Sequence, residues 1–374
     1  MKILLTGANG FIGKNLTHFL SKKANVEILS VTRDTSKEDF ETYVNNADWI
    51  IHLAGINRPK EEKEFVEGNV DLTNQICQTL INSNQKTPII FASSIQADKT
   101  NPYGLSKRAA EDALKRFLSD YDSPIFICRL ANVFGKWSRP NYNSAVATFC
   151  HNVANDLPIE IHSADAVIRL VYIDDVMEIF WGIINGEAVE QTFYIEPEYQ
   201  ITVGKLAKQI QTFKDSRQTM ITEKVGEGLT RALYSTYLSF LQPKQFDYSV
   251  PKHGDERGVF VEMLKTKDSG QFSYFTAYPG ITRGGHYHHT KTEKFLVIKG
   301  KALFKFKNLV TDEFYQLETT GEVPTVVETV PGWTHDITNI GDEEMIVMLW
   351  ANEIFDREKP DTYALPLTHN KSNL

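Results

Sequence analysis

Residues 2–130 alternate between short aliphatic runs and longer amphipathic stretches, and this alternation constrains the fold more than any other feature. The aliphatic runs are KILLT, VEILSVT, DWIIHLA, PIIFASS and SPIFICRL, and most are separated by stretches with helical periodicity. Strands that alternate with helices build βαβ units, which require a parallel sheet covered by helices on both faces. The pattern therefore predicts a doubly wound α/β domain.

The pattern changes near residue 250. Short apolar or alternating runs then follow one another closely, namely GVFVEML, QFSYFTAY, EKFLVIKG, ALFKFKNL, TVVETV and MIVMLWANE. Such spacing is typical of an antiparallel β-sandwich or barrel. A chain of 374 residues is expected to form two or three domains at about 150 residues each. We therefore expect one domain at residues 1–245 and a second at 246–374, with the junction in the polar segment QPKQFDYSVPKHGD.

Charge and cysteine content narrow the range of partners. The net charge of −8 gives no general attraction to phosphate backbones or anionic lipids, so neither nucleic acid nor a membrane is an expected partner. The N-terminal apolar stretch is too short for a signal peptide, and no run reaches the length of a membrane span. Cys77, Cys128 and Cys150 fit neither a disulfide framework nor a metal-binding pair. These features favour a reducing, cytoplasmic location.

The motif GANGFIG follows the first aliphatic run directly and precedes a helical pattern. Gly7, Gly10 and Gly13 would permit a tight turn and a close approach of a pyrophosphate to a helix N-terminus. The motif predicts a dinucleotide site in a Rossmann domain. Arg33 and Asp34 stand at the end of the second aliphatic run, where an acidic residue binds the 2′-hydroxyl of NAD and an arginine pairs with the 2′-phosphate of NADP. Both residue types are present, and we favour NADPH.

A second motif, NPYGLSK, places Tyr103 four residues before Lys107, so the two share one face of a helix. Ser94 ends the aliphatic run PIIFASS. The lysine would lower the pKa of the Tyr103 phenol and prepare it to exchange a proton with a carbonyl or carbinol oxygen, which Ser94 would hold. We therefore predict Ser94, Tyr103 and Lys107 as catalytic residues.

In this order, GANGFIG, HLAG, GNVDLTN, SS, YGLSK and RLANVFG resemble the successive motifs of the extended short-chain dehydrogenase/reductase family over residues 1–180. The resemblance implies that Asn132 and Arg169 lie on the side of a nucleotide-sugar substrate. Ile95 and Gln96 follow Ser94 where the dehydratases of the family carry Asp and Glu, so dehydration is not expected. The cofactor contacts that the resemblance implies are Gly7, Gly10, Phe11, Ile12, Gly13, Arg33, Leu53, Ala54, Gly55, Tyr103 and Lys107.

Histidines gather in the segment GGHYHHT. Alternate residues of a strand share a face, so His286 and His288 would both point into a barrel. Glu293 from the next run and His335 from a later one would complete a set of nitrogen and oxygen ligands. This set suits Zn²⁺ best, with iron, manganese or nickel as other candidates. His289 would point away from a regular strand, and it stays open as a substitute for His288.

These residues resemble the cupin superfamily. Its first motif is matched by the spacing from Gly280 to Gly300, and its second by Gly332, His335 and Asn339, with the proline shifted by one position. The segment DERGVFVE is similar to the opening of sugar 3,5-epimerases that act on 4-keto-6-deoxy nucleotide sugars. Those epimerases typically work without a metal, so the metal ligands and that mechanism do not both transfer unchanged.

Across nearly its whole length the chain resembles the CapF-like bifunctional epimerase/reductases of bacterial capsular polysaccharide synthesis. The resemblance implies a homodimer in which the cupin domain epimerises C-3 of a UDP-linked 4-keto-6-deoxy-N-acetylhexosamine and the Rossmann domain reduces its C-4 ketone with NADPH. The product would be UDP-2-acetamido-2,6-dideoxy-L-talose, a precursor of UDP-N-acetyl-L-fucosamine. The segments that support the resemblance are HLAGINRP, NPYGLSK, FGKWSRPNYNS, LYSTYLSFL, HYHHTKTEKFLV and FDREKPDTY.

Two alternatives stay open from the sequence. In the first, the chain is an NADPH-dependent sugar reductase whose cupin only dimerises and whose metal only stabilises the fold. In the second, it is a redox-neutral UDP-sugar 4-epimerase that retains NAD. The base that removes the C-3 proton is not identified by spacing, although a histidine outside the metal ligands or a lysine such as Lys294 could serve.

Overall fold

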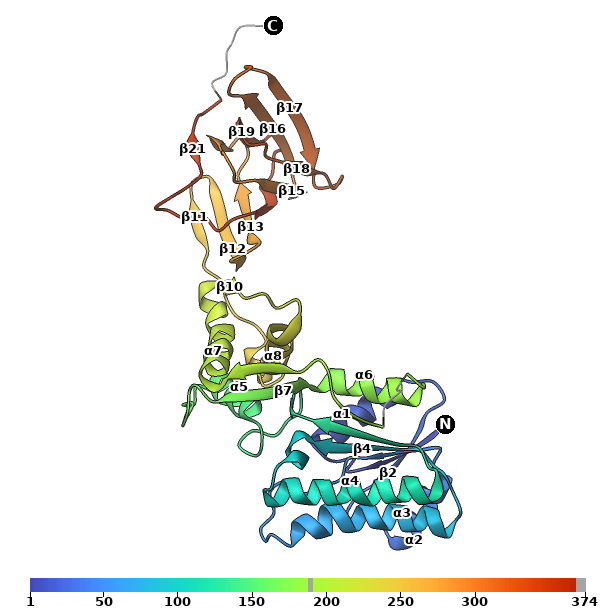
Figure 1. Cartoon of the computed structure of the whole chain (residues 1–374). Coiled ribbons are helices and arrows are strands. Elements are labelled where there is room, and N and C mark those ends of the chain that lie inside the picture. The colour runs from blue at the N-terminus through green and yellow to red at the C-terminus, as the bar shows by residue number, and fades with distance from the viewer. Residues whose placement is uncertain (188–190, 368–374) are drawn as a thin grey trace. The chain divides into compact units, whose positions relative to one another are not determined.

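The computed structural model describes residues 1–187 and 191–367 (Figure 1). The chain divides into two compact units, which we call the N-terminal unit (residues 1–210 and 231–241) and the C-terminal unit (residues 211–230 and from 242 onward). The domain limits 1–245 and 246–374 stay a prediction, and residues 368–374 lie outside the described residues. No helix in the described part of the chain is long and apolar enough to cross a membrane.

The N-terminal unit is built on a parallel sheet of six strands in the order β2-β1-β3-β4-β5-β8. Its strands are β1 (Lys2–Thr6), β2 (Glu27–Val31), β3 (Trp49–His52), β4 (Ile89–Ser94), β5 (Ile125–Leu130) and β8 (Thr192–Tyr194). A smaller sheet contains β6 (Asn132–Phe134), β7 (Val167–Tyr172) and β9 (Tyr199–Thr202).

Helices cover both faces of the large sheet, with α2, α3 and α4 on one face and α1 and α6 on the other (Figure 1). This arrangement confirms the predicted Rossmann fold. The helices are α1 (Phe11–Leu20), α2 (Lys37–Asn46), α3 (Leu72–Asn82), α4 (Pro102–Tyr121), α5 (Ala145–Ala154), α6 (Ile173–Ile184), α7 (Val203–Thr219) and α8 (Gly228–Leu238), with short turns of other helix types at η1 (Val66–Asp71), η2 (Ile95–Asp98) and η3 (Pro243–Gln245).

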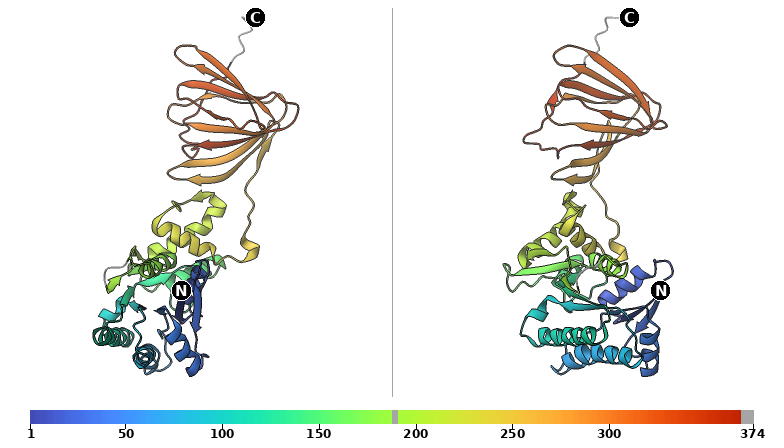
Figure 2. Two further views of the ribbon diagram at one scale, coloured as in Figure 1. Left: turned by 90° about the vertical axis from the view of Figure 1, so that its right-hand side faces the viewer. Right: turned by 45° about the vertical axis from the view of Figure 1, so that its right-hand side comes forward.

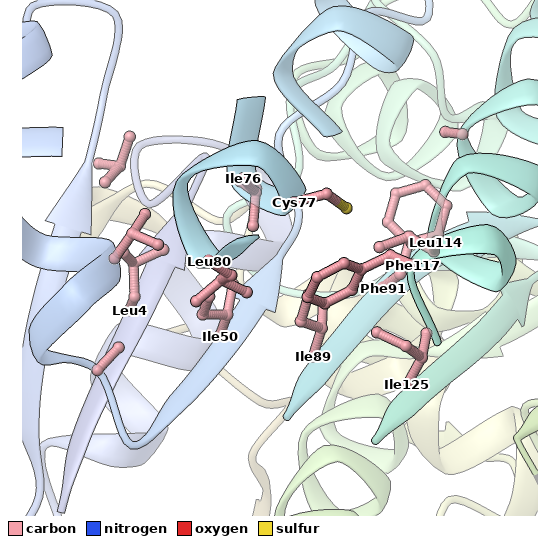
Figure 3. Packing of buried hydrophobic residues seen from close by; sticks show 14 of the residues in the cluster. Leu4, Ile50, Ile76, Cys77, Leu80, Ile89, Phe91, Leu114, Phe117 and Ile125 are labelled. Atoms are coloured by element: carbon pink, nitrogen blue, oxygen red, sulfur yellow. The ribbon is translucent and has the colours of Figure 1, made fainter. Parts of the chain in front are cut away.

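One hydrophobic core fixes α3 and α4 against the sheet (Figure 3). Each fully buried aliphatic or aromatic side chain contributes about 1.5–3 kcal/mol to folding. The core therefore sets where β4 and α4 lie, and these two elements carry the predicted catalytic residues. Its main side chains are Leu4, Ile50, Ile89, Phe91 and Ile125 from the strands, Ile76 and Leu80 from α3, and Leu114 and Phe117 from α4.

A buried ion pair reinforces the same contact. The Glu111 carboxylate on α4 is fully buried, and it accepts hydrogen bonds from the Ser93 hydroxyl at 2.5 Å and from the Arg129 guanidinium at 2.7 Å. Ser93 lies on β4 and Arg129 on β5. Separating this buried ion pair would lower the free energy of unfolding by about 3–5 kcal/mol. The network therefore holds α4 in one position over the sheet.

Apart from the end of α7, the start of α8 and the turn η3, the C-terminal unit is built from strands, and its two sheets enclose a barrel (Figure 2). One sheet has the order β10-β12-β13-β20-β15-β18 with β11 beside β12, and the other has the order β17-β16-β19-β14-β21. The predicted cupin-like barrel is confirmed. Its strands are β10 (Ile221–Thr222), β11 (His253–Asp255), β12 (Gly258–Thr266), β13 (Gly270–Ala277), β14 (Thr282–Tyr287), β15 (Glu293–Lys299), β16 (Lys301–Asn308), β17 (Phe314–Thr320), β18 (Val326–Glu328), β19 (Trp333–Asn339), β20 (Met345–Ala351) and β21 (Tyr363–Ala364).

Candidate active site and candidate metal centre

The turn between β1 and α1 leaves no room for side chains at two of the predicted glycines. Gly7 has φ +70°, and a Cβ added there would lie 2.9 Å from the backbone nitrogen of Ala54. A Cβ on Gly13 would lie 2.3 Å from the carbonyl oxygen of Gly7. The turn therefore places Gly10, the residue that precedes α1, in the lining of the cleft described next. A helix N-terminus at this position suits a pyrophosphate.

A cleft of about 770 Å³ opens along this turn. Phe11, Ile12 and Gly13 are not among its lining residues, and neither are Tyr103 and Lys107. Lys107 nevertheless lies close to the cleft, because a Cβ added to Gly55 would lie 3.7 Å from its Nζ. Of the predicted cofactor contacts, the lining includes Gly7, Gly10, Arg33, Leu53, Ala54 and Gly55.

Two side chains that the sequence did not predict as site residues fix the loop that lines this cleft. The Thr6 hydroxyl accepts hydrogen bonds from the backbone N–H groups of Leu53 and Ala54, each at 3.1 Å. The Asn69 amide binds both the N–H and the carbonyl of Ile56, at 2.8 and 3.0 Å. Together they fix the loop after β3. Asn69 belongs to a recognised family motif, whereas a threonine at the end of a strand carries no comparable signal.

The start of α4 positions Tyr103. The Asn101 side chain accepts a hydrogen bond from the N–H of Gly104 at 2.8 Å, and Pro102 occupies the first helical turn. An Asn cap followed by proline is a strong signal for a helix start. Ser94 ends β4, and its hydroxyl accepts from the N–H of Gln96 at 3.1 Å. The predicted catalytic residues thus come from two adjoining elements that the core holds together.

The pKa of the Tyr103 phenol differs from the expectation. Burial raises this pKa above its usual value, and a hydrogen bond with Ser94 lowers it only in part. The sequence predicted that Lys107 would lower the pKa of Tyr103, and this lowering is not found. Burial has the largest effect on the pKa of Tyr103 and on that of Lys107. Burial lowers the pKa of Lys107 to about 8, while Glu111 acts in the opposite direction. A phenol with a raised pKa is protonated at neutral pH, so Tyr103 is suited to donate a proton.

Asn132 and Arg169 lie side by side on β6 and β7. The Asn132 amide donates to the backbone carbonyl of Arg169 at 2.8 Å. The Arg169 guanidinium pairs with the Glu198 carboxylate at 2.6 Å, so its charge is already balanced within the protein. Their place on the substrate side stays a prediction.

The four predicted metal ligands converge inside the barrel. His286 on β14 lies opposite His335 on β19, Glu293 begins β15, and His288 follows the end of β14. One ligand atom from each of the four residues lies within 4.8 Å of the others. His289 does not join them, because its ring contacts Tyr287 and Tyr363 instead.

The chemistry of this group fits a metal ion. Both ring nitrogens of His335 are buried with no hydrogen-bond partner in the described part of the chain, and Glu293 Oε2 is 3.6 Å from its Nε2. Burial, followed by the neighbouring His335, lowers the pKa of His286 to about 4. A neutral imidazole is the form that binds metals, and three imidazoles with one carboxylate suit zinc.

The Glu293 carboxylate links the histidines to a lysine. Its Oε2 lies 3.2 Å from Nε2 of His288, and its Oε1 lies 3.1 Å from Nζ of Lys291. Burial raises the pKa of Glu293, but His288, His335 and Lys291 outweigh burial and bring it well below its usual range. The carboxylate is therefore ionised.

Lys294, which the sequence offered as one candidate base, lies on the outer face of β15. Side chains alternate along a strand, so Lys294 points away from Glu293. It is exposed and forms an ion pair with Glu328 on β18. Lys291, which the sequence did not single out, is the buried lysine of this site.

The barrel holds a cavity of about 180 Å³ that is lined in part by the histidine–glutamate group. Aromatic and aliphatic walls restrict water, which strengthens electrostatic interactions inside. Its polar lining includes Arg283, His286, Glu293, Thr329, His335 and Asp336, and its apolar lining includes Phe260, Phe275, Phe295, Phe304, Phe306, Ile337 and Leu349.

Two family models match the chain. Residues 3–195 match the NAD dependent epimerase/dehydratase family, and residues 253–363 match the polysaccharide biosynthesis C-terminal domain. The first match covers the glycine turn and the Tyr103 site. The second covers the barrel and its histidine–glutamate group.

Two known proteins are similar to this chain over both of its units. A UDP-2-acetamido-2,6-beta-L-arabino-hexul-4-ose reductase from Pseudomonas aeruginosa is 57% identical over 97% of this chain and 98% of its own length. The crystal structure of the capsular polysaccharide assembling protein CapF from Staphylococcus aureus is similar with a TM-score of 0.90 and 39% identity, and the match covers 98% of this chain and 100% of that one.

A more distant structure is similar to part of the chain only. The UDP-glucuronic acid 4-epimerase from Bacillus cereus, solved with NAD, has 18% identity and a TM-score of 0.56 over 64% of this chain and 98% of its own. That likeness shows the fold alone. From the family models and the two full-length relatives, the chain belongs to the NAD dependent epimerase/dehydratase family and, within it, to the CapF-like proteins that carry a polysaccharide biosynthesis C-terminal domain.

Proposed function

We propose that the chain is a bifunctional nucleotide-sugar enzyme. Its C-terminal unit epimerises C-3 of a UDP-4-keto-6-deoxy-N-acetylhexosamine, and its N-terminal unit reduces the C-4 ketone with NADPH to give UDP-2-acetamido-2,6-dideoxy-L-talose. The name of the Pseudomonas aeruginosa relative supports the reductase and the UDP-linked keto sugar. The observation that carries the proposal is that each unit holds its own set of reactive side chains, Tyr103 with its neighbours in one and the histidine–glutamate group in the other.

The reduction needs a proton at the C-4 oxygen. NADPH, when bound in the cleft of the N-terminal unit, would supply the hydride. The Tyr103 phenol, protonated at neutral pH, donates its proton to the oxygen, and the Ser94 hydroxyl holds that oxygen by a hydrogen bond. The Lys107 ammonium stabilises the phenolate that remains.

The epimerisation depends on an acidic C-3 proton. A 4-keto group makes this proton acidic, because the negative charge left behind delocalises onto the ketone oxygen. Zinc, held by His286, His288, Glu293 and His335, would supply a Lewis acid that favours this charge. The aromatic walls of the cavity limit water beside it. Once the ketone is reduced the C-3 proton is no longer acidic, so reduction fixes the inverted configuration.

We also propose a homodimer, on the resemblance to cupins, and a cytoplasmic location. The second proposal is supported by Cys77, Cys128 and Cys150, which are all free and buried. Free thiols suit a reducing compartment.

The experiment that tests the function uses the zinc-loaded protein and a UDP-linked 4-keto-6-deoxy-N-acetylhexosamine in D2O, with and without NADPH. We expect deuterium at C-3 without NADPH, followed by an inverted and reduced sugar when NADPH is added. Product mass and C-3 configuration are the measurements. Reduction without deuterium or inversion would leave a reductase with a non-catalytic barrel, and unchanged NADPH with tightly held NAD would indicate a 4-epimerase.

Cofactor preference gives a separate prediction. Arg33 and Lys37 both line the cleft beyond β2. A charged hydrogen bond to a phosphate contributes about 1.5–3 kcal/mol, so Arg33→Ala should raise the KM for NADPH about 10- to 100-fold and leave the KM for NADH nearly unchanged. Arg357→Ala, an exposed arginine of the C-terminal unit, serves as the control. Equal losses with both cofactors would show that Arg33 does not contact the 2′-phosphate.

A further inference from the structure

The segment FDREKPDTY near the C-terminus has no role in the proposed function, yet Asp361 within it contacts the loop beside the candidate metal centre. The Asp361 carboxylate accepts hydrogen bonds from the N–H groups of His289, Thr290 and Lys291, at 3.0, 2.6 and 2.8 Å. It also accepts from the Thr290 hydroxyl at 2.9 Å. The loop between β14 and β15 is therefore folded around one side chain that lies 70 residues further along the chain.

The backbone of Asp361 acts on His288 directly. Its carbonyl oxygen lies 2.5 Å from Nδ1 of His288. A carbonyl can only accept, so Nδ1 donates to it and Nε2 is the nitrogen that is left to face the other ligands. Nε2 is the atom that faces Glu293. Histidines that bind metals commonly donate their other N–H to a carbonyl or carboxylate, which fixes the tautomer and the ring orientation.

Asp361 is also linked to a second predicted ligand, Glu293, through Lys291. Its N–H is bound to Asp361, and its Nζ lies 3.1 Å from Oε1 of Glu293. The ion pair occupies Oε1 and leaves Oε2 facing His288 and His335. One aspartate thus orders the backbone that carries both His288 and the partner of Glu293.

Asp361 is itself held in place by the barrel. The short strand β21 follows it and pairs with β14, with Tyr363 opposite Tyr287. The two tyrosine rings stack with centroids 5.2 Å apart, and the N–H of Leu365 donates to the carbonyl of Gly285 at 2.8 Å. These contacts anchor the segment on the strand that carries His286.

We propose that Asp361 is a positioning residue of the candidate metal centre: it fixes the loop of residues 289–291 and the ring orientation of His288, so that the ligands are arranged before the metal binds. The inference rests on the metal site of the proposed function. Asp361 acts only through His288 and Lys291.

The test compares Asp361→Ala and Asp361→Asn in the full-length protein with Asp356→Ala as a matched control. Asp356 lies in the same segment, and its side chain accepts from the N–H of Glu358 at 2.8 Å, within its own turn. Loss of a residue that orients a ligand typically lowers metal affinity about 10- to 100-fold, and we expect this for Asp361→Ala. Asn keeps one acceptor oxygen, so its loss should be smaller.

Two measurements decide the outcome. Zinc affinity is measured by competition with a chromophoric chelator, and hydrogen exchange of the amides at 289–291 is followed in the zinc-free protein, where Asp361→Ala should speed exchange. Unchanged zinc affinity in Asp361→Ala, with wild-type zinc uptake intact, overturns the inference and leaves the metal site standing. A wild-type protein that takes up no zinc removes the metal site and the inference together.

Discussion

Replacing Tyr103 with phenylalanine should slow reduction strongly and leave deuterium exchange at C-3 unchanged. Phenylalanine keeps the ring that contacts Phe65, with centroids 5.9 Å apart, and removes only the hydroxyl that donates the proton. A positioned general acid contributes about 10²- to 10⁴-fold to a rate, so kcat for NADPH oxidation should fall by that factor. The two readouts are NADPH absorbance and the mass of sugar recovered from D2O.

Tyr121→Phe is the matched control. Tyr121 lies on the same helix, is partly exposed, and stacks on Phe117 through its ring alone. Its substitution should change neither readout. A Tyr103→Phe protein that still oxidises NADPH at the wild-type rate would remove Tyr103 from the reaction. If deuterium exchange were lost with reduction, a single site would carry both steps.

The strand positions of both units could be predicted, because they follow from local patterns. The run KILLT coincides with β1 (Lys2–Thr6), and PIIFASS contains β4 (Ile89–Ser94). The order of strands in the barrel could not be predicted. β13 pairs with β20 and β14 with β19, and such pairings depend on packing between segments far apart in sequence, which no local pattern encodes.

The candidate metal ligands were predictable for a similar reason, since spacing alone placed His286 and His288 on one face. The structure adds what spacing cannot supply. Asp361 and Lys291 have ordinary local sequences, and only the folded barrel brings Asp361 to the loop and Lys291 to Glu293. The Tyr103 pKa was misjudged because the sequence shows a neighbouring lysine but not the burial of the phenol.

Glu293→Gln should slow deuterium exchange at C-3 strongly while reduction of the already inverted sugar continues at the wild-type rate. Glutamine keeps the size of the side chain but removes the negative charge that lies between His288, His335 and Lys291. A Lewis acid contributes several kcal/mol to stabilising developing charge, so at 1.36 kcal/mol per tenfold exchange should slow by about 10²- to 10³-fold. Removing zinc from the wild-type protein with a chelator should have the same effect, and adding zinc back should restore only the wild type.

Glu328→Gln is the control for this prediction, because Glu328 is exposed on β18 and pairs with Lys294 on the outer face of the neighbouring strand. Glu293→Gln leaves Lys291 buried without its partner, which lowers the free energy of unfolding by about 3–5 kcal/mol. A melting curve of Glu293→Gln must therefore show that the barrel is still folded when exchange is measured. With the fold intact, exchange at the wild-type rate in both Glu293→Gln and the chelated protein would mean that the metal only stabilises the barrel. Loss of exchange in these two and not in Glu328→Gln would assign C-3 inversion to the histidine–glutamate group.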